Sequence, residues 1–190
     1  GHVCCSMAEG FGYTAAEADY LNVFTVLNTL PVYKQYYGNS ENKYWLGGFV
    51  WTGFDYRGEP TPFKWPNINS HFGIMDVCGF PKNIYYYYQS WWTDKEVLHV
   101  SPHWNWPDKI GKPIDVWVNT NADDVELFLN GKSIGKKVIP RNSHLQWEVN
   151  YEPGILEAVA YKKGKKLMTK VETTGQATKV TLSTDKTILL

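Results

Sequence analysis

Apolar and polar residues alternate in the second half of the chain. A period of two predicts strands with one buried face, and the segments with this pattern are residues 114–118, 125–129, 145–149 and 156–160. Asn130 and Gly131 predict a tight hairpin turn after the second segment. The lysine-rich residues 162–166 predict another turn, before a strand at 167–171. Strands at this spacing predict an antiparallel β-sandwich.

The first half of the chain lacks this alternation. Residues 14–30 open with a capping box and continue at helical spacing, which predicts a helix. Residues 44–51 are an apolar run without alternation, typical of a strand that is buried on both faces of a parallel sheet. Residues 84–92 predict a short aromatic helix with Pro81 near its first turn, although the four tyrosines at 85–88 also suit a strand.

A long segment joins this strand to the aromatic helix. Residues 52–81 are rich in Gly, Asn and Pro, and a loop of this length in a compact domain is usually functional. A strand of a parallel sheet needs neighbouring strands with crossover helices on each side, which one or two helices and a loop cannot supply. We therefore expect the first part to be the end of a larger domain. Residues 177–182 suggest the first strand of a further domain, cut off at Leu190.

Composition excludes several classes of protein. The 190 residues carry 19 basic and 19 acidic side chains, so the chain has no net charge and nucleic-acid binding is not expected. No apolar run reaches the roughly 18 residues of a membrane span. Three cysteines are too few for a disulfide framework, and we expect free thiols. Aromatic residues make up 16% of the chain and lie mostly before residue 107, whereas most basic residues lie after it.

Several long strings carry a specific resemblance. GGFVWTGFDYRGEPTP at 47–62, WPNINSHFGIMD at 65–76 and CGFPK at 78–82 resemble the eighth barrel strand and following loop of glycoside hydrolase family 2, in particular its β-galactosidase-like members from Bacteroidetes. The strings at 97–106 and 118–133 resemble the immunoglobulin-like domain that follows the barrel in that family. The resemblance implies an α/β barrel fragment, the end of a (β/α)8 barrel at residues 1–96, then an immunoglobulin-like β-sandwich at 97–175 and a truncated β domain at 176–190.

The resemblance also implies a set of site residues. Glu9 takes the position of the catalytic nucleophile, and Trp51 that of the tryptophan on which the sugar stacks. The other candidate substrate-binding residues lie in the long loop and are Asp55, Glu59, Trp65, Asn67, Asn69 and His71. Each has a structural alternative: Glu9 as a solvated carboxylate, Trp51 as a barrel core residue, Asp55 as a partner of Arg57, and the polar loop residues as ligands of the loop's own backbone.

The expected function is retaining hydrolysis of terminal β-linked sugars, of β-galactosidase type. The family's acid/base glutamate follows an asparagine, and because the chain has no Asn-Glu dipeptide we expect it to be inactive alone. Alternatives are a noncatalytic carbohydrate-binding or structural sandwich, or, within the enzyme class, a β-glucuronidase or β-mannosidase. For a glucuronidase, Arg57 is the one arginine in the relevant region.

Partners and location follow from the same resemblance. The expected partners are a carbohydrate substrate and the remainder of the barrel, with a homo-oligomer possible. No cofactor is expected. His99 and His103 have a spacing that suits a helical metal site, but Pro102 between them argues against a helix, and no metal site is expected. The termini do not reveal the location, and the family suggests the periplasm or the cell exterior.

Overall fold

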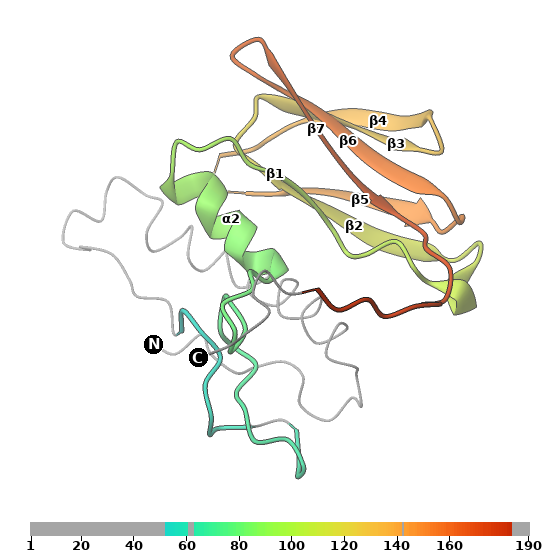
Figure 1. The fold of residues 1–190 in the computed structure, drawn as a ribbon. Coiled ribbons are helices and arrows are strands. Elements are labelled where there is room, and N and C mark those ends of the chain that lie inside the picture. Colours follow the sequence, from blue (N-terminus) through green and yellow to red (C-terminus); the bar gives the residue numbers. More distant parts are fainter. Residues whose placement is uncertain (1–51, 61–62, 142, 184–190) are drawn as a thin grey trace, which may run out of the picture.

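The computed structural model describes residues 52–60, 63–141 and 143–183. Seven strands form two antiparallel sheets, one with the order β1-β2-β5 and the other with the order β4-β3-β6-β7 (Figure 1). A helix, α2, precedes the strands along the chain. The elements are α2 (Asn83–Trp92), β1 (Leu98–Ser101), the 3-10 turn η1 (Pro107–Lys109), β2 (Pro113–Thr120), β3 (Asp124–Leu129), β4 (Lys132–Val138), β5 (Leu145–Asn150), β6 (Ile155–Lys162) and β7 (Lys165–Glu172).

The core lies between the two sheets and is built from the alternating positions. Val116 and Val118 of the first sheet are fully buried, as are Leu127 and Leu156 of the second. Burying each such side chain contributes about 1.5–3 kcal/mol. Strand β5 alternates buried and exposed residues along its whole length. The predicted antiparallel β-sandwich is therefore confirmed.

The two predicted hairpin turns are also confirmed. Asn130 and Gly131, between β3 and β4, have φ angles of 50° and 80°, and Lys163 and Gly164, between β6 and β7, have 49° and 82°. Two consecutive residues with positive φ give the turn whose twist matches paired strands, and Asn-Gly favours it. The Asn130 side chain also accepts a hydrogen bond from the Ile155 N–H at 2.8 Å, which ties this turn to β6.

Helix α2 covers the outer face of the three-stranded sheet (Figure 1). Residues 84–92 form a helix and not a strand, because Ile84 and Tyr87 then share one face and pack together against Trp117 of β2. The Trp117 ring is 2% exposed and stacks on His144 at 4.1 Å between ring centroids. The Trp91 indole N–H donates to the Ser143 carbonyl at 2.9 Å. The helix therefore forms a third layer on the sandwich.

The predictions for the two ends of the chain have different outcomes. Residues 173–183 contain no strand, and Val180 and Leu182 are 85% and 92% exposed. The expected strand at 177–182 does not form among the described residues, where no strand lies beside it to pair with its backbone, and the further domain that it was expected to begin stays a prediction. The expected helix at 14–30 and strand at 44–51 lie outside the described residues, and the domain boundaries stay predictions.

Two features bear on the environment of the protein. Among the residues that the structure describes, none belongs to a helix with the length and apolar character of a bilayer crossing. Cys78 is a free thiol at the surface, as predicted, whereas Cys4 and Cys5 lie outside the described residues.

His99 on β1 makes the seam between helix and sheet sensitive to acid. Its ring stacks on Tyr86 at 3.8 Å, and its Nε2 lies 2.7 Å from the side-chain oxygen of Asn83. Burial lowers the pKa of His99 to about 4. The unfolded chain takes up this proton near pH 6.5. The folded chain does so only near pH 4, so the free energy of unfolding should fall as the pH drops from about 6.5 to 4.

We expect His99→Phe, which keeps an aromatic ring for Tyr86, to remove this part of the acid sensitivity. Between pH 7 and 4.5 the free energy of unfolding, measured with urea, should fall by roughly 2–3 kcal/mol less in the variant than in the wild type. Parallel pH profiles for wild type and His99→Phe would contradict the assignment.

Candidate functional site

The long loop from residue 52 to Lys82 folds back on itself below α2 (Figure 1). Isolated bridges join Phe54 to Met75 and Arg57 to Asn69. The Asp55 N–H donates to the Met75 carbonyl at 2.9 Å, and the Met75 N–H donates to the Gly53 carbonyl at 3.0 Å. These contacts give the loop a defined backbone without regular sheet, and the prediction of a long nonrepetitive segment is confirmed.

Asp55 is the central polar residue of this loop. It is 8% exposed, and its Oδ1 accepts the Gly73 N–H at 2.7 Å. Its Oδ2 lies 2.7 Å from Nζ of Lys82, which also donates to the His71 carbonyl at 2.9 Å. The ion-pair partner of Asp55 is therefore Lys82 and not Arg57 as one sequence alternative had it. Both carboxylate oxygens of Asp55 hold the loop together.

Gly73 lies where no other residue fits. A Cβ atom there would be 2.3 Å from the Asp55 nitrogen and 2.6 Å from the Met75 carbonyl oxygen, both of which belong to the backbone. Such contacts are far below van der Waals distance, so the backbone would have to move. The absence of a side chain at Gly73 lets the Asp55 carboxylate reach the Gly73 N–H.

The polar residues between 67 and 71 bind one another and the loop backbone. The Asn67 amide donates to the carbonyls of Pro60 and Asn69 at 3.3 and 3.0 Å, and its oxygen lies 3.1 Å from Nε2 of His71. Burial lowers the pKa of His71, an effect that the Asp55 charge opposes and the Lys82 charge adds to. These contacts of Asn67 and His71 fit the alternative in which the polar residues support the loop itself.

Glu59 and Trp65 differ from these residues because they are exposed. Trp65 is 84% exposed, and Glu59, with a φ of 46°, accepts a hydrogen bond from the Tyr56 hydroxyl. The Gly58 N–H donates to the Ile68 carbonyl at 2.8 Å, which joins the two segments that carry them. An exposed indole and an exposed carboxylate provide an apolar face and a hydrogen-bond acceptor, the two kinds of group that a sugar ring requires.

The remaining candidates cannot be placed. Glu9 and Trp51 lie outside the described residues, so their roles as nucleophile and sugar platform stay predictions. Over the described ranges no group of three or more His, Cys, Asp or Glu side chains is arranged to hold a metal ion.

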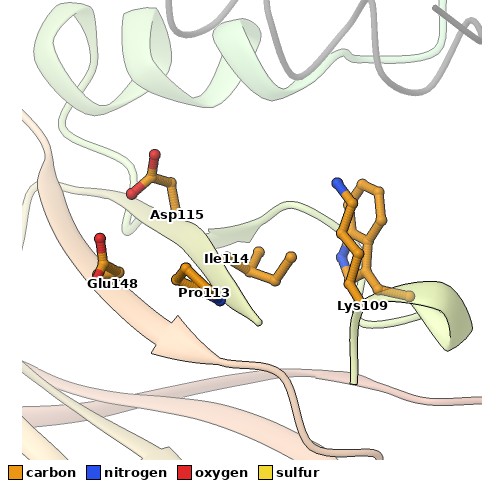
Figure 2. Close-up of a pocket in the computed structure, with 6 residues that line it drawn as sticks. Lys109, Pro113, Ile114, Asp115 and Glu148 are labelled. Carbon is orange, nitrogen blue, oxygen red and sulfur yellow. The ribbon is translucent and has the colours of Figure 1, made fainter. Parts of the chain in front are cut away.

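A pocket on the sandwich was not found by sequence reasoning. It has a volume of about 160 Å³ and is lined by Trp106, Lys109, Pro113, Ile114, Asp115 and Glu148. Asp115 and Glu148 are cross-strand neighbours on β2 and β5, and Lys109 lies on the other side (Figure 2). The Trp106 ring stacks on His103 at 4.3 Å and has Nζ of Lys109 at 4.4 Å from its centroid. Trp106 lies between the predicted aromatic helix and the first predicted strand of the sandwich, where the sequence pattern gave no signal for a pocket.

Sequence comparisons match this chain to a domain family and to a longer protein. Residues 111–168 match a family described as a domain of unknown function (DUF4982). The β-galactosidase BoGH2A of Bacteroides ovatus is 50% identical over 152 residues, which cover 78% of this chain and 18% of that protein.

Solved structures agree with this sequence match. A β-glycosidase from Bacteroides vulgatus has a TM-score of 0.70 and 40% identity, covering 80% of this chain and 20% of that one. A glycosyl hydrolase family 2 member from Bacteroides cellulosilyticus has a TM-score of 0.66 and 32% identity, covering 74% of this chain and 23% of that one. Further matches include a β-glucuronidase of Bacteroides uniformis. The chain thus spans about a fifth of the length of these relatives.

Gly73→Ala should open the loop, because the added methyl group meets backbone atoms of Asp55 and Met75. We expect hydrogen-exchange protection of the Asp55 and Met75 amides to fall by at least about tenfold, which corresponds to roughly 1.4 kcal/mol. The matched control is Gly53→Ala in the same loop, since a Cβ there meets nothing within 4 Å. Unchanged protection in Gly73→Ala would contradict the close approach.

Proposed function

This chain belongs to glycoside hydrolase family 2 as a partial segment, and we propose that the protein containing it is a retaining glycosidase of β-galactosidase type. The observation that carries the proposal is the 50% identity to a β-galactosidase over 152 residues, which include most of this chain. In this proposal the chain contributes only part of the active site, which agrees with its length relative to its relatives.

In the proposed reaction Glu9 is the nucleophile. Its carboxylate attacks the anomeric carbon and forms a glycosyl-enzyme, while a second carboxyl group, from outside this chain, protonates the leaving oxygen and later activates water. Trp51 supports the sugar ring from below, because an indole face packs on the apolar C–H face of a sugar. Since the second carboxyl group lies elsewhere, the chain alone should not turn over substrate.

Residues 1–96 are proposed to be the C-terminal portion of a (β/α)8 barrel whose active site opens at the C-terminal ends of its strands, and the described part of this segment begins at residue 52. Large apolar side chains on this segment support the proposal, because they are exposed where a barrel neighbour would bury them. Phe54, Val77, Phe80 and Trp92 are all at least half exposed. Large apolar side chains that are exposed in one segment suit a surface for contact with protein.

A neutral terminal sugar is the proposed substrate. A glucuronide would need a free cation for its carboxylate, and Lys82 is neutralised by Asp55 at 2.7 Å. Arg57 and Lys64 are exposed cations of the loop, and they keep the β-glucuronidase alternative open. A β-mannosidase would accept a sugar with a different hydroxyl stereochemistry, and no contact among the described residues selects between these sugars.

One observation favours the second candidate, noncatalytic carbohydrate binding by the sandwich. The pocket beside Trp106 combines an indole, the apolar Pro113 and Ile114, and the carboxylates of Asp115 and Glu148. Carboxylates accept hydrogen bonds from sugar hydroxyls, and the pocket has one more acidic than basic lining residue, which suits an uncharged saccharide.

Glu9→Gln in the complete protein should lower kcat for an aryl β-galactoside by more than about 1,000-fold, because an amide is a poor nucleophile. The wild type should hydrolyse the aryl β-galactoside at least about tenfold faster than the matching β-glucuronide and β-mannoside. Glu17→Gln is the control, since sequence assigns Glu17 to a helix cap. Activity of Glu9→Gln within tenfold of the wild type would refute the nucleophile, and a preference for the glucuronide would favour the alternative.

The second candidate predicts saccharide binding by the 190-residue chain. Trp106→Ala should then weaken binding to neutral oligosaccharides by about tenfold or more, measured by titration calorimetry or on a glycan array. The exposed Tyr161 of β6 is the matched aromatic control, and Tyr161→Ala should bind as the wild type does. Equal binding by wild type and Trp106→Ala would exclude the pocket as the binding site.

A further inference from the structure

We propose that Lys82 is a positioning residue of the sugar site, whose ammonium group holds the loop that follows Trp51 in its binding conformation. The inference rests on the proposed function, because it assigns a role in binding substrate. Lys82 does so through Asp55 and the loop backbone and does not itself contact the sugar.

The contacts of Lys82 connect the first residues of the loop with its return segment. Its Nζ binds the Asp55 carboxylate at 2.7 Å and the His71 carbonyl at 2.9 Å, and its backbone N–H donates to the Ile74 carbonyl at 3.1 Å. The side chains of Lys82 and Asp55 are only 13% and 7% exposed. One side chain therefore joins the start of the loop to its return segment.

This network reaches the residue next to the proposed sugar platform. The Ile74 N–H donates to the carbonyl of Thr52 at 2.9 Å, and Thr52 directly follows Trp51 in the sequence. Release of Lys82 would free residues 71–74 and, with them, the hydrogen bond that holds Thr52.

The position of Lys82 is itself fixed by the sandwich. Lys82 is the N-cap residue of α2, and no side chain caps that helix, so its own side chain is available to the loop. Ile84 and Tyr87 of α2 pack on Trp117 of β2, which fixes the start of the helix. The immunoglobulin-like part thus serves as the base on which the loop is anchored.

Charge, and not only volume, is required at this position. Removing one member of a buried ion pair leaves the charge of the other buried without a partner, which destabilises the folded conformation of the loop. Lys82→Met keeps the aliphatic length and removes the charge, whereas Lys82→Arg keeps the charge. The two variants therefore separate packing from electrostatic anchoring.

The test is a kinetic comparison in the complete protein with an aryl β-galactoside. Lys82→Met should raise KM by at least about tenfold with a smaller loss in kcat, as expected for weakened sugar binding. Lys82→Arg should restore KM to within about fivefold of the wild type. Lys132→Met, an exposed lysine on β4, is the control and should leave both constants unchanged. Asp55→Asn provides a second variant with nearly unchanged volume and should resemble Lys82→Met.

A second readout reports on the loop without catalysis. The Lys82 charge lowers the pKa of His71 and the Asp55 charge raises it, so Lys82→Met should raise the His71 pKa in an NMR titration. A structural change in another part of the molecule would leave the pKa of His71 unchanged.

The proposal is overturned if folded Lys82→Met keeps KM within twofold of the wild type, or if Lys82→Arg loses as much as Lys82→Met. If the wild type hydrolyses no aryl glycoside, the proposed function fails, and the His71 titration still decides whether Lys82 anchors the loop. An unchanged His71 titration in Lys82→Met would overturn that anchor as well.

Discussion

The described structure depends on strand β2 being buried on both faces. Val116 and Val118 point into the sandwich core, while Trp117 between them points outward and receives α2. A single strand therefore serves two hydrophobic clusters. The hydrophobic effect acts on both sides at once, so a change in the register of β2 would exchange the two sets of side chains and disrupt both interfaces. This constraint fixes where α2 starts and hence where the long loop ends.

The sequence predicted the sandwich well because its strands follow a local rule. Alternation identified β2, β3, β5 and β6, and Asn-Gly identified one hairpin, since pleat geometry and turn conformation depend on neighbouring residues only. The same alternation could not reveal the role of Trp117, because a residue on the face away from the core is read as solvent-exposed. Only the tertiary packing of the aromatic helix buries it.

The candidate site was harder to predict than the sandwich, because the sequence does not show which cation pairs with which carboxylate. Asp55 was expected to orient a sugar or to pair with Arg57, which is near in sequence. The loop brings Lys82, and not Arg57, to Asp55 from the far end, and the lack of a side chain at Gly73 leaves room for the backbone of Asp55 and Met75; a role of Asp55 toward a sugar stays a prediction. Which of several cations pairs with a carboxylate depends on the loop's path, and residue types do not encode that path locally. Glu59 and Trp65 remain exposed, as a binding role requires, while Glu9 and Trp51 stay predictions.

An ion pair suits the anchoring of this loop better than an apolar contact would. Gly, Asn and Pro make up about a third of residues 52–82, and large apolar side chains of this segment, such as Phe54 and Phe80, are exposed, so apolar packing contributes little to its conformation. A buried charge pair gives up favourable hydration on both sides and gives directional contacts in return, so its net stabilisation is small. Its value is specificity: Asp55 accepts from one backbone N–H and one ammonium group, and few other loop paths satisfy both. If the loop binds a sugar as proposed, it gains more from a unique conformation than from added stability.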